Sequence, residues 1–418
     1  MVTPLLRPPT RRAALAWLAV LPAACSGPEA RSPDRIDAAW HRTDLQDNLL
    51  PRWLAHAPRP GGGFQLRFDR AWKAQPEPAL TLAGQARLVY AFAAGHELTR
   101  EARYLDAARR GADFLLERFA DPLHGGFFLT VAPDGSPRSM NKRASDHAFA
   151  LLALTELYRV GRDRRHRDAA LKAWADIETG FFDPLGGVVD ECGRDFVPQP
   201  GARTQTPVMH LFEATQALAA ATGDAAVRSG ARHLGDFAAY RLLQGQAESE
   251  GGGARIPECY DEAWKPLPTR EAGGYIDLGH QFEWCHLLTT GATVWPVYAQ
   301  VAERVLAYAL AAGYDEIDGG CGRRVFPDGG RADASKGWWQ QAECLHALLV
   351  AAHASGRNDL WRRYEQTLGL VRDQLVDASQ GGWRAAFALP CKSGGCRDEQ
   401  PDPYPMVRLH QAALKLAA

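Results

Sequence analysis

Apolar residues recur at steps of three and four along several long stretches of the chain, as on one face of an α-helix. Several of these stretches end in glycine, which is common at helix C-termini. The pattern therefore predicts helices over residues 84–99, 144–161, 207–224, 295–313, 338–356 and 360–377.

Glycine doublets divide the chain into repeats. They start at residues 61, 125, 186, 251, 319 and 381, so successive starts are 64, 61, 65, 68 and 62 residues apart. A period of this size holds two helices and a glycine-rich hairpin. Six such units that close on themselves predict an all-α fold, an (α/α)6 barrel with short β-hairpins at one mouth. The inner helices of such a barrel enclose a cavity, and polar residues at their starts are expected to meet at its mouth.

Composition and charge indicate which kinds of molecule the protein binds. The 418 residues are 46% hydrophobic, and 48 basic residues stand against 49 acidic ones, for a net charge of −1. The sequence shows no concentrated stripe of Lys and Arg, which argues against nucleic acid as a partner. We expect the barrel to occupy residues 28–418 as one domain.

Residues 1–27 differ in character from the rest of the chain. Three arginines without an acidic residue precede an uncharged apolar run at 13–24, and Cys25 follows. This order of a basic segment, a short apolar run and small residues predicts an export signal. A membrane-spanning helix is excluded because the run is too short to span a bilayer. A paired arginine before the run favours twin-arginine export, and Cys25 fits a lipid anchor, the one membrane contact expected. We therefore expect a periplasmic or otherwise exported protein; the alternative is a misassigned start and a cytoplasmic enzyme.

The other seven cysteines show no metal-ligand spacing such as Cys-x-x-Cys, so no metal site is predicted from them. Cys391 and Cys396 are close enough in sequence to close a small disulfide loop in an oxidising compartment. Cys285 and Cys344 lie in apolar runs and are predicted to be small core residues.

The stretch LGHQFEWCHLL at 278–288 carries ionisable groups inside an apolar run. His280 and Glu283 are three residues apart, so in a helix they share one face, and neither belongs on a core face without a partner. Polar residues recur in the other predicted inner helices, and such a series converges on the barrel axis, which predicts a ligand site. The alternative is that these residues only form buried hydrogen bonds between neighbouring helices. The series comprises Arg87, Tyr90, His147, His210, Glu213, His280, Glu283, Trp284, Trp338, Trp339 and Glu343.

Four motifs within this series resemble those of the N-acylglucosamine 2-epimerase family, which also includes mannose isomerases and cellobiose 2-epimerases. The motifs are QAR with Tyr90, then MHLFEA, GHQFEW and WWQQAE, and the resemblance runs in order over residues 36–412. It implies the (α/α)6 barrel already predicted from spacing. It also implies a sugar substrate, a reaction without a metal or redox cofactor, and a monomer or homodimer.

The implied reaction removes the proton from carbon 2 of an open-chain sugar and gives an enediolate. Return of the proton to carbon 2 is epimerisation, and return to carbon 1 is aldose–ketose isomerisation. Histidine suits this chemistry because it titrates near neutral pH. By resemblance, His280 is one of two catalytic histidines, Glu283 fixes its tautomer or raises its basicity, and Arg87 contacts the sugar oxygens. The other positions expected to contact the sugar or relay protons are Tyr90, His147, His210, Glu213, Trp284, Trp338, Trp339, Glu343 and Arg408.

The chain departs from the family near its C-terminus. The second family histidine normally lies in a motif like Pro-Tyr-His-x-x-Arg, but residues 403–408 read PYPMVR, with Pro405 in the histidine position. Proline transfers no proton, so His410 is our candidate replacement as a catalytic residue. Two alternatives stay open: a catalytically weakened sugar-binding relative, and a glycoside hydrolase or lyase on the same barrel. Neither the identity of the sugar nor the choice between epimerisation and isomerisation follows from the sequence.

Overall fold

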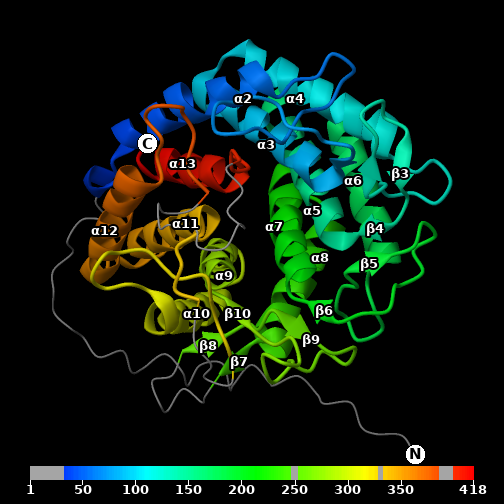
Figure 1. Cartoon of the computed structure of the whole chain (residues 1–418). Coiled ribbons are helices and arrows are strands. Elements are labelled where there is room, and N and C mark those ends of the chain that lie inside the picture. The colour runs from blue at the N-terminus through cyan, green and yellow to red at the C-terminus, as the bar shows by residue number, and fades with distance from the viewer. Residues whose placement is uncertain (1–32, 246–252, 328–332, 386–398) are drawn as a thin grey trace, which may run out of the picture.

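In a computed structural model that describes residues 33–245, 253–327, 333–385 and 399–418, helices form a closed double ring. Neighbouring inner helices contact one another, and the last contacts the first, so the ring closes (Figure 1). The inner helices are α3 (Leu82–Thr99), α5 (Ala144–Gly161), α7 (Thr206–Thr222), α9 (Leu278–Gly291), α11 (Trp338–Ser355) and α13 (Tyr404–Leu416). The predicted (α/α)6 barrel is confirmed.

Each inner helix is paired with an outer helix on the periphery. The outer helices are α1 (Ala38–Thr43), α2 (Leu50–His56), α4 (Ala102–Phe114), α6 (Arg164–Gly180), α8 (Ala225–Phe237), α10 (Tyr298–Gly313) and α12 (Asn358–Gln374). Short helical segments adjoin them: the 3₁₀ helix η2 (Pro33–Arg35) and the π-helices η3 (Asp44–Leu49), η4 (Leu115–Phe119) and η5 (Ala238–Leu242). The π-helix η3 joins α1 to α2, so these form one outer segment. Inner helices such as α5 are apolar on almost every side because they pack on both neighbours and on an outer helix, whereas outer helices keep one charged face.

The two ends of the described chain close the ring, because α1 packs on α13. A chain of buried hydrogen bonds joins them: Asp44 accepts from His410 Nε2 at 2.9 Å and from Trp383 Nε1 at 2.8 Å. The other nitrogen of His410 lies 2.8 Å from His41, which in turn lies 2.7 Å from the Tyr364 hydroxyl. Every polar atom in this contact therefore has a partner, as burial requires.

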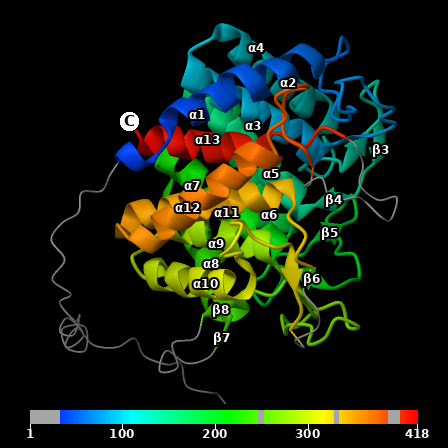
Figure 2. The ribbon, with the colours of Figure 1, turned by 60° about the vertical axis from the view of Figure 1, so that its left-hand side comes forward.

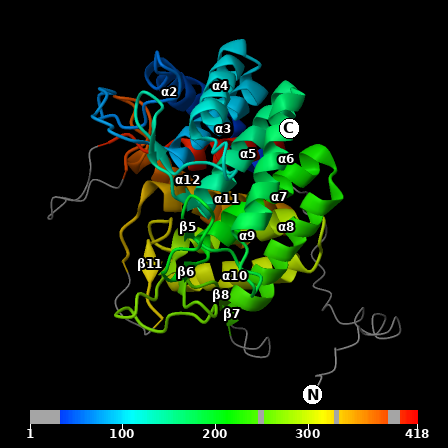
Figure 3. The ribbon, with the colours of Figure 1, turned by 90° about the vertical axis from the view of Figure 1, so that its right-hand side faces the viewer.

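Short antiparallel strands lie just before the inner helices α3, α5, α7 and α9 and at other points of the described chain. They pair as β1 (Leu80–Thr81) with β2 (Thr130–Val131) and β3 (Pro137–Ser139), β4 (Lys142–Arg143) with β5 (Glu191–Cys192), β6 (Arg203–Thr204) with β9 (Cys259–Tyr260), β7 (Gln244–Gly245) with β8 (Ala254–Arg255), and β10 (Ile276–Asp277) with β11 (Arg324–Val325). Most of them gather at the end of the barrel where the inner helices begin (Figures 2 and 3), as predicted. The β7–β8 hairpin instead packs beside α10.

The glycine doublets that start at 61, 125, 186, 319 and 381 are tight turns that connect an outer helix to this strand-bearing end, and the doublet at 251 lies outside the described residues. Gly125 and Gly126 have φ values of 76° and 64°, a region that side chains with a Cβ rarely adopt. A Cβ on Gly126 would also lie 2.8 Å from the His147 ring. The turn therefore requires glycine for conformation and for space.

A side chain at the fourth position of four inner helices holds these turns. In three helices it is a glutamine whose amide both donates to and accepts from one backbone residue, at distances between 2.7 and 3.0 Å. The pairs are Gln85 with Phe64, Gln281 with Ile256 and Gln341 with Cys321. The fourth helix, α5, carries His147 at this position.

Helix boundaries differ from the predicted ones by a few residues. The largest differences are three residues. Helix α10 begins at Tyr298 rather than at 295 because the chain turns through Pro296 before the helix starts, and α12 ends at Gln374 rather than at 377. Cys285 and Cys344 are buried core residues, as predicted. Residues 1–27 and the Cys391–Cys396 pair lie outside the described residues. Among the helices described, none is both long and apolar enough to cross a membrane.

Candidate active site

His280 is held by a carboxylate near the mouth of the barrel. It lies at the third position of α9, and its Nδ1 donates to Glu258 Oε2 at 2.7 Å. Burial alone would lower the pKa of His280, but the Glu258 carboxylate, helped by Asp277 and Glu283, raises it to about 10. Because Glu258 occupies Nδ1, Nε2 is the ring nitrogen left to exchange a proton with a ligand. Glu283 was expected to fix the tautomer of His280 or to raise its basicity. The carboxylate that bonds to Nδ1 and fixes the tautomer is Glu258 instead, whereas Glu283 does contribute to the raised pKa.

Glu258 is itself fixed. It lies just before β9, and Gln205 and Thr206 donate to its two carboxylate oxygens at 3.1 and 2.8 Å. Burial would raise the pKa of Glu258, but the His280 ring lowers it below its ordinary value. The pair therefore forms an oriented acid–base group, with the charge of one member stabilised by the other.

A second group of side chains lies deeper along the barrel axis. Glu213 accepts from the Tyr404 hydroxyl at 2.9 Å and pairs with Arg408 at 2.7 Å. Although burial raises its pKa, Arg408 and His210 lower the pKa of Glu213 to about 2, so it is ionised. Nδ1 of His210 lies 3.6 Å from Glu283 Oε1 and 3.7 Å from Glu213 Oε2, and none of these three buried atoms has a hydrogen-bond partner among the described residues.

Two carboxylates near the axis titrate close to neutral pH. Burial and the Glu343 carboxylate raise the pKa of Glu283 to about 7. Burial likewise raises the pKa of Glu343 to about 7, although Arg408 opposes this shift. Carboxyl groups of this kind can either donate or accept a proton at pH 7, which ordinary surface carboxylates cannot do.

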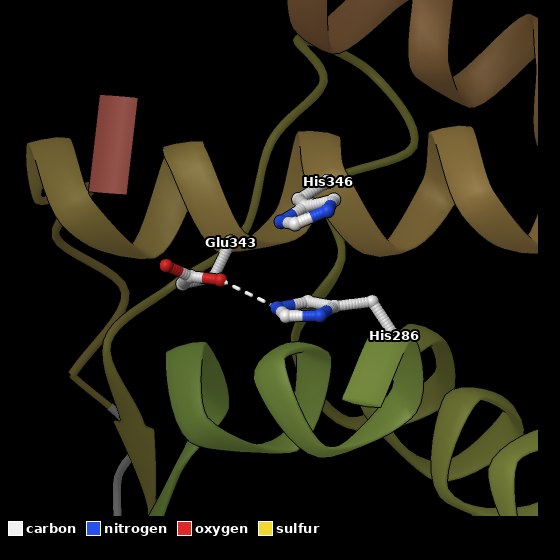
Figure 4. Close-up of side chains that lie close together, drawn as sticks. All are labelled: His286, Glu343 and His346. Carbon is white, nitrogen blue, oxygen red and sulfur yellow. Dashed lines mark hydrogen bonds and ion pairs between the residues drawn. The ribbon is translucent and has the colours of Figure 1, made fainter. Parts of the chain in front are cut away.

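Glu343 belongs to a compact cluster with two histidines. Its Oε2 accepts from His286 Nε2 at 2.8 Å, and the His346 ring stacks on the His286 ring at 3.9 Å (Figure 4). Burial lowers the pKa of both histidines well below its ordinary value, so both rings are neutral.

The remaining axial residues combine charge with aromatic faces. Arg87 lies 4.0 Å above the Phe149 ring and pairs with Asp402 at 3.0 Å. Tyr90 donates to Gln411 at 2.6 Å. Trp339 lies near the mouth, with its ring 5.1 Å from that of His280, and Trp338 is the first residue of α11 and half-buried.

A cavity of about 680 Å³ lies among the C-terminal halves of the inner helices. Tyr90, Glu213, His346 and Arg408 reach it, whereas His280 lies toward the other end. The ligand pocket was expected at the starts of the inner helices, whereas this cavity lies behind the axial polar groups, at the opposite ends of the same helices.

Three predicted site residues do not join these groups. His147 accepts from the Phe127 amide at 2.9 Å and donates from Nδ1 to the Arg143 carbonyl at 2.8 Å, so both ring nitrogens are used in the position that glutamine fills in other repeats. Burial lowers its pKa to about 4. Trp284 is fully buried and donates to Gln205 at 2.6 Å, so it offers no face to a sugar.

The third is His410. It is fully buried between α13 and α1, in the network with Asp44 and His41 described above. This position turns it away from Arg408, so the expected replacement of the missing histidine by His410 is wrong. Pro405 is the second residue of α13, where proline is favoured because the first turn of a helix needs no amide donors.

Sequence reasoning missed four residues of the site: Glu258, His286, His346 and Tyr404. The two histidines stand one turn beyond Glu283 and Glu343 on the same helices, so helical spacing was a usable signal. Tyr404 lies within the PYPMVR segment. Glu258 had no signal, because it comes from an irregular segment between two hairpins and is brought to His280 only by the fold.

Comparisons with known proteins agree with this architecture. The model of the family described as N-acylglucosamine 2-epimerase (GlcNAc 2-epimerase) matches residues 62–390. The chain is 27% identical to the N-acylglucosamine 2-epimerase of Homo sapiens, over 87% of this chain and 90% of that protein. It is also 27% identical to the D-mannose isomerase of Thermobifida fusca, over 88% and 92%. The solved structure of cellobiose 2-epimerase from Spirochaeta thermophila DSM 6192 has a TM-score of 0.82 at 23% identity, over 93% of this chain and 99% of that one.

Hydrolases on the same kind of barrel are more distant. The GH76 α-mannanase of Bacteroides thetaiotaomicron has a TM-score of 0.63 at 14% identity, over 92% of this chain and 98% of that one. The glycoside hydrolase alternative is therefore not favoured.

Proposed function

The chain belongs to the N-acylglucosamine 2-epimerase family, and from this premise we propose that it is a carbohydrate isomerase acting at carbon 2 of an open-chain sugar. The relatives named as 2-epimerases and mannose isomerases support this class of reaction. The observation that carries the proposal is the His280–Glu258 pair, a histidine base held by a buried carboxylate at the barrel mouth.

In the proposed reaction, Nε2 of His280 takes the proton from carbon 2. The electrons of the broken C–H bond form the C1–C2 double bond, and the carbonyl pair moves onto the oxygen of carbon 1 to give the enediolate. Glu258 stabilises the imidazolium that forms, because its charge lies 2.7 Å from Nδ1. Arg87 and the carboxyl group of Glu283 are the proposed donors to the sugar oxygens.

We favour aldose–ketose isomerisation over epimerisation for this chain. Epimerisation needs a second group on the opposite face of the enediolate, and the family position for it holds Pro405 while His410 faces α1. A single base that returns its proton to carbon 1 on the same face needs no second histidine. Pro405 is also the observation that favours a second candidate, a relative that binds a sugar without turnover.

Proton exchange distinguishes these candidates. The purified protein is incubated in D2O with mannose, glucose, N-acetylglucosamine or cellobiose, and NMR follows deuterium at carbons 1 and 2 together with new products. We expect a ketose as the new product, with deuterium at carbon 1 in those turnovers in which the imidazolium exchanges its proton with solvent before returning it. A 2-epimer formed without a ketose would contradict the single-base route, and sugar binding with neither exchange nor a new product would support the second candidate.

The same assay tests the role of His280. His280→Ala should abolish exchange, with a loss of roughly 10²–10⁴-fold or more for removal of a general base. His124→Ala is the matched control, because His124 is exposed on a hairpin of the described chain. Wild-type exchange in His280→Ala would remove the catalytic assignment.

We further propose that residues 1–27 direct export, with Cys25 as a lipid attachment point, and that the mature protein is a monomer or a homodimer. Support comes from the arginine-led apolar run at the N-terminus. Mass spectrometry of the protein from its native cells tests the first part: an intact N-terminus in the cytoplasmic fraction refutes export. Sedimentation of the purified protein gives the assembly state.

A further inference from the structure

His286, Glu343 and His346 face one another across the contact between α9 and α11 (Figure 4). Glu343 and His346 are three residues apart on α11 and therefore lie on one face of that helix. His286 reaches them from α9, and one ligand atom from each of the three side chains lies within 4.8 Å of the other two. Figure 4 shows a nitrogen of each ring on the side that faces the carboxylate.

Hydrogen bonds within the cluster leave one buried nitrogen without a partner among the described residues. The one bond among the three side chains joins His286 Nε2 to Glu343 Oε2 at 2.8 Å. His346 is 7% exposed and stacks on His286 with an angle of 19° between the rings, yet its buried Nδ1 has no hydrogen-bond partner among the described residues. Burial of an unpaired polar nitrogen is unfavourable, so a partner for this ring would stabilise the fold.

We propose that His286, Glu343 and His346 bind a divalent transition-metal ion. Two imidazoles and one carboxylate suit zinc, cobalt or nickel, whereas magnesium and calcium prefer oxygen ligands. Metal–ligand distances of about 2.0–2.2 Å place tetrahedral ligands roughly 3.3 Å apart. The His286–Glu343 contact therefore opens slightly on binding, and His346 closes on it by rotation of its side chain.

Three protein ligands leave one coordination position for water or a ligand, as in catalytic zinc sites. His346 lines the cavity of about 680 Å³, so the cavity supplies an entry path to the ion. The ion would lie beyond Glu283 as seen from the His280 end, and the inference goes beyond the proposed isomerase reaction, which uses no metal.

A second group of potential ligands, His210, Glu213 and Glu283, is less suited to a cation. Arg408 already places a positive charge 2.7 Å from Glu213, and the Tyr404 hydroxyl occupies the same carboxylate oxygen. No Lys or Arg within the described ranges forms an ion pair with Glu343, whose charged contact there is with His286. The carboxylate of Glu343 is thus available to a metal without the loss of an arginine partner.

Cobalt titration tests the site without reliance on turnover. The full-length protein is stripped with a chelator and titrated with Co²⁺, with visible d–d absorption as the readout, and Zn²⁺ is then added in competition. We expect one equivalent of Co²⁺, absorption typical of four-coordinate cobalt, and displacement by Zn²⁺. Wild-type protein that shows no such absorption, or none that Zn²⁺ displaces, overturns the proposal.

Variants locate the ion. His286→Asn and His346→Asn should each weaken binding by at least about tenfold, since each removes one ligand. The control His353→Asn, on the same helix but outside the cluster, should bind as the wild type does. Equal binding by all three variants overturns the assignment. Circular dichroism shows whether each variant is folded. If one of the two histidine variants does not fold, the cobalt affinity of the other tests the assignment. In either ligand variant that folds, Zn²⁺ should no longer raise the melting temperature as it does in the wild type.

Discussion

Replacement of Glu258 by glutamine is the sharpest test of the proposed base. The substitution keeps the size of the side chain and removes the charge that lies 2.7 Å from His280 Nδ1. A neutral amide can also donate to Nδ1, which would place the proton of the ring on Nε2 and leave no base facing the sugar.

The structure sets the direction and the size of the effect. The pKa of His280 is about 10 with Glu258 present, and loss of that charge lowers the pKa, because burial of the ring lowers it too and only Asp277 and Glu283 remain to oppose burial. Since the base must be unprotonated to act, the wild-type kcat/KM should rise with pH well above 6.5. In Glu258→Gln this rise should move to lower pH, and the plateau should fall by about 10²–10⁴-fold.

The assay is the initial rate of proton exchange or ketose formation between pH 5 and pH 10.5. Glu262→Gln is the matched control, because Glu262 is an exposed glutamate four residues away. With its amide nitrogen facing Nδ1, the glutamine no longer accepts from Gln205, whereas its oxygen still accepts from Thr206. Loss of the Gln205 bond should reduce the free energy of unfolding by about 1–3 kcal/mol, so rates are compared at a temperature where each variant is folded. An unchanged plateau together with an unchanged pH profile would refute the role of Glu258.

Three further predictions concern stability and the residues corrected above. His147→Gln should leave the free energy of unfolding within about 1 kcal/mol of the wild-type value, because glutamine makes the equivalent backbone hydrogen bonds in three other repeats. His147→Ala should lower it by about 1–3 kcal/mol in denaturant titrations, and equal losses in the two variants would contradict this. His410→Asn should lower the free energy of unfolding by about 1–3 kcal/mol but leave kcat per folded molecule unchanged, and a rate loss above about tenfold would return His410 to the reaction. The pKa of Glu283 is raised from 4.5 to about 7, so its contribution to stability is complete below about pH 4.5 and is lost as the pH rises through 7. Glu283→Gln should therefore flatten the fall in unfolding free energy between pH 5 and 8 by up to about 3 kcal/mol, and an unchanged slope would count against the raised pKa.

The fold was predictable from local information. Glycine doublets recur every sixty or so residues in the sequence, and each of the described turns has glycine at positive φ. The apolar runs between doublets are long enough for two helices, so repetition determined the closed ring. The spacing of three residues also determined that His280 and Glu283 share a helix face, and that His210 and Glu213 do. These properties depend on neighbours within one turn or one repeat, which a sequence displays directly.

The partners of these side chains were decided by tertiary structure. Glu258 reaches His280 from the segment between β8 and β9, and His286 meets Glu343 from the neighbouring helix. His410 bonds to Asp44 because the first and last helices close the ring. Whether a histidine on an inner helix faces the axis, a turn or an outer helix depends on a rotation of about 100° per residue and on which element packs there. The sequence alone therefore determined which residue types line the barrel wall, and only packing between distant segments decided which of them form the site.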